Sequence, residues 1–99
     1  MSLSVVIQDE NARELSRWNG EVPASVFDRA DAEGACLPFV DAYGDTVFNQ
    51  LQIPVLIIEL VNLILDADDQ NVAATVDDLI KFVRGAQERP HTYVRFIGE

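Results

Sequence analysis

The longest apolar run of the chain, from Ile53 to Leu65, constrains the fold most. Pro54 suits the first turn of a helix, where its missing N–H leaves no intrahelical bond unmade. Only Glu59 and Asn62 are polar within the run, and together with Asp66 they recur every three or four residues, as on one face of a helix. The many β-branched residues favour a strand instead, but the length of the run and this spacing favour a helix. We expect a helix that is buried on most sides and too short to span a bilayer.

A turn is predicted just before this helix. Residues 41–45 combine two aspartates with Gly44, which are residue types that open and close tight turns. The flanking segments 36–40 and 46–51 are rich in β-forming residues, so we expect a β-hairpin. Pro38 places the first of its strands at a sheet edge or at a bulge.

The N-terminal third is predicted to begin with another hairpin. Residues 4–8 and 13–18 both alternate as strands do, although good helix formers make a helix over 11–18 the alternative. Residues 21–35 have partial helical spacing and predict a short helix or helical turn that ends near Gly34.

The C-terminal third is predicted to hold a second helix and a final strand. An apolar stripe at helical spacing covers residues 72–88, with Asp69 or Asn71 as the N-cap and Pro90 beyond the end. Residues 91–97 then alternate as a strand.

This order of elements, β-β-(short α)-β-β-α-α-β, predicts a single α+β domain over residues 1–99. We expect a small, mostly antiparallel sheet of about five strands, packed on one face by the two helices. The predicted core consists of Leu37, Phe39, Val47, Leu56, Leu60, Leu63, Val76, Leu79, Ile80, Val83, Val94 and Phe96.

Charge and cysteine content exclude several classes of function. The net charge of −10 argues against binding nucleic acid or docking on anionic membranes, and it permits a basic protein partner, a cation or solubility alone. The single cysteine excludes an intramolecular disulfide and a cysteine-rich zinc site. Because the N-terminus has no basic region followed by a long apolar segment, we expect a cytoplasmic protein.

No catalytic residue, cofactor or metal site is predicted. The chain has no glycine-rich phosphate motif, and Cys36 lies in an apolar segment where thiols are usually inert. His91 is the only histidine. The acidic segment 66–71 between two helices superficially resembles a calcium loop, but Asn71 and Asp77 stand where that loop needs glycine and glutamate.

Polar residues near the 41–52 hairpin are candidates for a small pocket. Asp41, Asp45, Asn49, Gln52 and Glu59 supply carboxylates and amides there. Glu59 stands among apolar residues and must reach solvent or a cation. Arg95 or Arg17 is its expected partner, while Tyr43, Tyr93 and Trp18 are candidate interface aromatics.

Acidic residues also gather around the start of the second helix. We expect Asp66, Asp68, Asp69, Asp77 and Asp78 to form one continuous negative surface, with a separate acidic group at Asp28, Asp31 and Glu33.

Two short motifs resemble those of a family of uncharacterised bacterial proteins. They are the string Asp41-x-Tyr43-Gly44-Asp45-Thr46-Val47-Phe48-Asn49-x-x-Gln52 and the ending Tyr93-x-x-Phe96-Ile97-Gly98. The resemblance covers the second half of the chain and implies a short bacterial cytoplasmic protein. The resemblance implies no activity.

Together these observations predict a non-enzymatic acidic interaction module, comparable to immunity proteins or antitoxins, that binds a basic protein partner. The alternative is a small-molecule or cation-binding domain with its carboxylate and amide pocket around residues 41–52. The sequence leaves the oligomeric state open.

Overall fold

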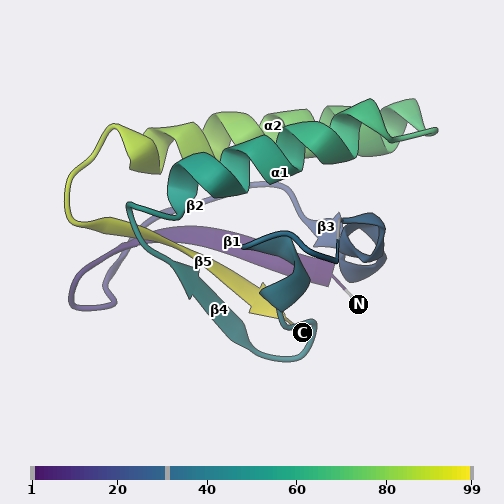
Figure 1. The fold of residues 1–99 in the computed structure, drawn as a ribbon. Coiled ribbons are helices and arrows are strands. Elements are labelled where there is room, and N and C mark those ends of the chain that lie inside the picture. The colour runs from purple at the N-terminus through teal and green to yellow at the C-terminus, as the bar shows by residue number, and fades with distance from the viewer. Residues whose placement is uncertain (1, 31, 99) are drawn as a thin grey trace.

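The computed structural model describes residues 2–30 and 32–98, and within them it forms one antiparallel sheet with a layer of helices (Figure 1). The path of the sheet runs β2-β1-β5-β4, and β3 pairs with the start of β1. The strands are β1 (Ser2–Asp9), β2 (Glu14–Arg17), β3 (Val22–Pro23), β4 (Asp45–Phe48) and β5 (Thr92–Gly98). The predicted α+β class is confirmed.

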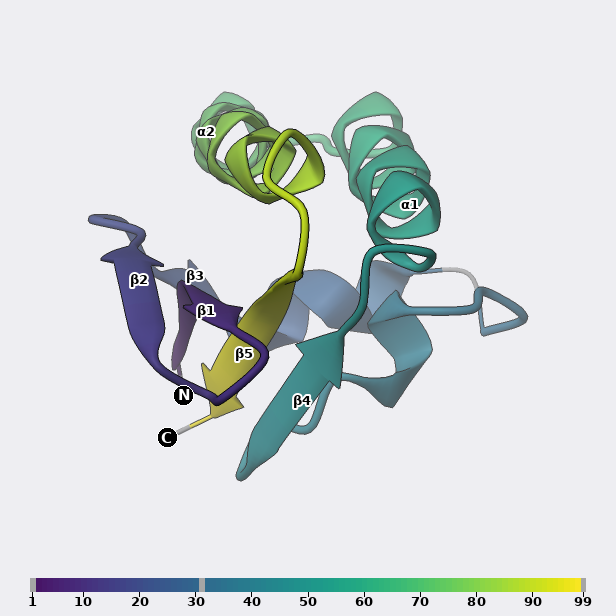
Figure 2. The same ribbon diagram turned by 90° about the vertical axis from the view of Figure 1, so that its left-hand side faces the viewer.

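Two helices cover the same face of the sheet. Figure 2 shows α1 (Ile53–Leu65) and α2 (Gln70–Gln87) side by side above the strands. Two short 3-10 turns, η1 (Ala24–Arg29) and η2 (Leu37–Phe39), lie between β3 and β4 in the chain. No helix in the described part of the chain is long and apolar enough to cross a membrane.

Local polar contacts set where the helices begin. The Asn49 side-chain oxygen accepts hydrogen bonds from the backbone N–H groups of Leu51 and Gln52, both at 3.0 Å, which turns the chain from β4 into α1. The Asp69 carboxylate accepts from the Asn71 N–H at 2.8 Å and caps α2, as one of the two predicted caps.

The core lies between the sheet and the two helices. Alternate residues of β1 and β5, among them Val5, Val94 and Phe96, meet Leu56, Leu60 and their neighbours from α1 and α2. Phe96 also makes edge-to-face contacts with Phe27 and Phe48 at ring distances of 5.8 and 5.7 Å. The predicted core residues are buried, with the exceptions of Phe39 and Val47.

The first strand of the predicted central hairpin is absent. Residues 36–40 form η2 and its flanks instead, and Phe39 is 68% exposed. The β-forming composition of this segment was misleading because its backbone N–H groups bind a side chain of α1 rather than a neighbouring strand.

The second strand is shorter than predicted and buries the other face. β4 ends at Phe48, which pairs with Val94 and points into the core. Val47 pairs with Arg95 on the opposite face and is 45% exposed. Apolar residues alternate too weakly in this segment for the sequence to predict which face of the strand is buried.

The N-terminal hairpin is confirmed, and the alternative helix over 11–18 is wrong because β2 pairs with β1. The short helix predicted within 21–35 is the 3-10 turn η1, which ends at Arg29 rather than near Gly34. Asp31, which was predicted to belong to an acidic surface group, lies outside the described residues.

Candidate functional site

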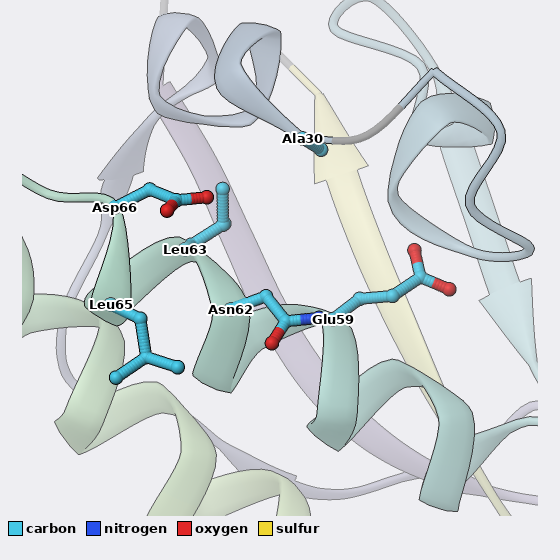
Figure 3. A pocket seen from close by; sticks show the side chains of 6 residues that line it. All are labelled: Ala30, Glu59, Asn62, Leu63, Leu65 and Asp66. Carbon is cyan, nitrogen blue, oxygen red and sulfur yellow. The ribbon is translucent and has the colours of Figure 1, made fainter.

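The most specific polar contact of the molecule joins Glu59 to three successive backbone N–H groups. The carboxylate accepts from Ala35 at 2.9 Å, from Cys36 at 3.1 Å and from Leu37 at 2.9 Å. Figure 3 shows the Glu59 side chain pointing from α1 toward this loop. The predicted partners of Glu59 are wrong, since Arg95 pairs with Asp45 and Arg17 pairs with Glu14. A concave row of backbone N–H groups can satisfy a carboxylate as well as a cation can.

The same contact involves Cys36, the only cysteine of the chain. Cys36 is fully buried, and its thiol donates to the Gln52 carbonyl at 3.7 Å. Burial, aided by the nearby Glu59 charge, raises the pKa of Cys36 to about 11. A thiol in this state is a poor nucleophile at neutral pH.

Beside Glu59 lies a shallow pocket of about 200 Å³. Its walls come from α1 and from the residue that follows η1: Ala30, Glu59, Asn62, Leu63, Leu65 and Asp66 (Figure 3). The Glu59 oxygens already accept hydrogen bonds from the backbone N–H groups of residues 35–37. The polar side chains that this pocket offers a ligand are therefore mainly those of Asn62 and Asp66.

The carboxylates predicted around the 41–52 segment bind separate partners. Asp41 accepts from the Tyr43 N–H at 2.8 Å and thereby closes the turn. Asp45 lies 3.0 Å from the Arg95 guanidinium on the face of the sheet opposite the helices. Among the described residues no group of three or more His, Cys, Asp or Glu side chains is placed to hold a metal ion.

The amides of the same segment shape the backbone. The Gln52 side chain accepts from the Asn49 N–H at 2.9 Å, so the two amides close one turn. The Gln50 amide lies within 2.8 to 3.1 Å of the Ala86, Arg89 and Thr92 carbonyls and ties this turn to the end of α2. Their role is structural, and the predicted pocket around residues 41–52 stays a prediction.

Asn49 and Tyr93 do come together. They line an open depression of about 290 Å³ with Gln50, Leu51 and His91. His91 is exposed and has a φ of 59°, in the left-handed region. The other two candidate interface aromatics lie elsewhere. Tyr43 is exposed, whereas Trp18 is buried and its indole N–H donates a hydrogen bond to Asp78 at 2.8 Å.

Three of the predicted acidic residues lie at one end of the helical layer, and the other two lie near the middle of α2. Asp66, Asp68 and Asp69 occupy the connection between α1 and α2, and Asp77 and Asp78 follow on α2; all five are exposed. η1, which carries the exposed Asp28, borders this end because Ser25 and Val26 share a depression with Ala67 and Asp69. Asp69 and Asp78 also have structural contacts, as the α2 cap and the Trp18 acceptor.

Sequence reasoning missed the outer face of α1. Val55, Ile58, Val61 and Leu65 are all exposed, and Ile58 and Leu65 retain 60% and 75% of their accessible surface. Their spacing of three and four residues places them on one side of the helix, opposite the buried Leu56, Leu60 and Leu63. The even apolar character of the run concealed which side would face solvent.

Comparisons with known proteins add no relative: no family model, curated protein or solved structure matches this chain.

Proposed function

We propose that this protein is a non-enzymatic interaction module that binds a basic protein partner, as immunity proteins and antitoxins do. The contact surface would be the acidic surface defined by Asp66, Asp68, Asp69, Asp77 and Asp78, which runs from the α1–α2 connection to the middle of α2. The proposal rests on the exposure of all five residues, between the α1–α2 connection and the middle of α2, in a chain with a net charge of −10.

Two features make this acidic surface suitable for recognition. Its backbone is held in place, because Asp69 caps α2 and Asp78 ties α2 to Trp18. Among the residues that the structure describes, Asp66 has no such side-chain contact, and Asp77 forms an exposed ion pair with Lys81 at 3.2 Å. Exposed pairs of this kind contribute little to stability, so these carboxylates remain available to a basic partner.

Electrostatic recognition predicts a specific kinetic signature. Attraction between opposite charges accelerates encounter, and salt screens it beyond about 8 Å at physiological ionic strength. The association rate should therefore fall steeply with salt, while the dissociation rate changes much less.

The test uses a basic partner isolated by affinity capture and then purified. The variant Asp66→Asn, Asp68→Asn, Asp77→Asn removes three charges and leaves the structural Asp69 and Asp78 intact. A matched control, Glu10→Gln, Glu14→Gln, Glu88→Gln, removes the same number of charges from exposed residues in the β1–β2 turn, in β2 and just beyond the C-terminal end of α2.

We expect stopped-flow association to slow about tenfold or more for the aspartate variant and far less for the control. A partner whose association ignores both salt and the aspartate variant would refute the proposal.

A further inference from the structure

We infer that two copies of this chain pair through the outer face of α1. This face is defined by Val55, Ile58, Val61 and Leu65, and the exposed Leu51 extends it at the N-terminal end. The inference goes beyond the proposed function, because it requires no other protein and uses a different surface.

The first argument is the character of the helix. A helix that is apolar around most of its circumference is normally buried on most sides. Within one copy, the sheet and α2 cover only the side that carries Leu56, Leu60 and Leu63. The exposed side is therefore expected to pack against another apolar surface. The α1 helix of a second copy has the matching length and chemistry.

The second argument is charge. Glu59 is the only charged residue of α1, a helix that the structure describes in full, and its carboxylate is turned away into the η2 loop. The outer face therefore offers a basic partner no acid to pair with. It fits a surface that is itself apolar and free of charge, as an identical α1 face is.

The third argument is area. From their exposed fractions, the five side chains leave on the order of 500 Å² of apolar surface on each copy. Pairing two copies buries roughly twice that, and neighbouring polar groups bring the total near the roughly 1,200 Å² at which specific interfaces begin. An interface of this size is at the low end of specific complexes, where weak and transient associations are found.

A two-fold axis across the middle of α1 satisfies these constraints. The two helices then run antiparallel, and Ile58 of each copy lies against Val61 of the other. Such an interface is isologous and closes on itself, so it yields a dimer and no larger assembly.

Sedimentation equilibrium of the full chain, over about 1 to 500 µM, tests the inference. We expect a monomer–dimer equilibrium that Ile58→Asp weakens about 100-fold or more, because the substitution would bury two unpaired charges. Leu65→Asp should act in the same direction. Both residues are exposed in the single copy, so circular dichroism and thermal melting should show both variants folded. Leu15→Asp, at an exposed apolar position on the edge strand β2, is the matched control and should leave the equilibrium unchanged.

Salt provides an independent readout. Two copies of net charge −10 repel each other, so added sodium chloride should tighten this dimer several-fold. The opposite response is expected for a basic partner of the acidic surface, so the two proposals fail separately. A chain that stays monomeric throughout, or a dimer that persists in both aspartate variants, overturns the inference. So does a monomeric chain whose binding to a basic partner is abolished by Ile58→Asp, since the face would then belong to that partner.

Discussion

Removing the Glu59 carboxylate should destabilise the protein more than any other single change at a partly exposed residue. The carboxylate is the acceptor for three consecutive N–H groups, and two of them belong to the buried residues Cys36 and Leu37. In Glu59→Ala these two groups lose their acceptor with little access to water. The N–H of the exposed Ala35 can bind solvent instead.

The expected loss follows from these contacts. Each buried N–H left without an acceptor costs roughly 1–3 kcal/mol. Alanine avoids the ordering of a long side chain, which returns roughly 1.5 kcal/mol. We therefore expect Glu59→Ala to lower the free energy of unfolding by about 3 kcal/mol, a large part of the roughly 5–15 kcal/mol that such domains have. Glu59→Gln should lose about 2 kcal/mol, since its amide keeps one acceptor oxygen but turns an NH₂ group toward the same donors.

Urea unfolding followed by circular dichroism measures both losses, with Glu88→Gln as the control. Glu88 is an exposed glutamate that follows α2, and its substitution should change stability by less than about 0.5 kcal/mol. Amide proton shifts of Cys36 and Leu37 should move in both Glu59 variants as the hydrogen bonds are lost. A loss below about 0.5 kcal/mol in Glu59→Ala, or a Glu59→Gln variant as stable as the original, would show that the three N–H groups do not depend on this charge.

Four further outcomes are expected. Leu60→Ala, at a fully buried position of α1, should cost roughly 2–5 kcal/mol in urea unfolding, and a loss below about 0.5 kcal/mol would mean that α1 is oriented differently. Ala12→Gly should stabilise by roughly 0.5–1 kcal/mol, because Ala12 has a φ of 65° that glycine adopts without strain. Ala74→Gly, within the exposed side of α2, is its control and should cost roughly 1 kcal/mol; equal losses in both would contradict the strained turn. The Cys36 thiol should react slowly with thiol reagents in the native protein and rapidly in urea, and fast native labelling would show that the thiol is accessible. The folded pKa of Cys36 is raised to about 11, so the unfolded chain releases its proton first. The stability from this group is therefore complete below about pH 9 and is lost as the pH rises to about 11, a decline of about 2–3 kcal/mol that Cys36→Ala should remove.

The sequence was sufficient wherever local patterns decide the structure. Both long helices, the first hairpin and the final strand follow from periodicity, and the Asp69 cap follows from residue type and position. These elements account for the α+β class and for most of the core.

The sequence was insufficient where a residue far along the chain determines the local structure. Residues 36–40 have the composition of a strand, but the N–H groups of Cys36 and Leu37 bind Glu59, more than twenty residues further on, and the segment forms a 3-10 turn. Val47 and Phe48 are both apolar, and only the pairing of Phe48 with Val94 chooses which of them is buried. Neither outcome has a local signal that an inspection of the sequence alone could use.

The outer face of α1 is a different kind of discrepancy, because there the sequence prediction and the single copy disagree about the same residues. The run 53–65 predicts a helix buried on most sides, whereas a two-layer domain can cover an outer helix only from beneath. The surplus of apolar residues is unfavourable in water, and the largest apolar patch on a protein surface is often functional. The net charge of −10 makes copies of this chain repel one another, which opposes non-specific association. Pairing through α1 would then need a close apolar fit to overcome that repulsion, and the salt dependence of the dimer measures this balance directly.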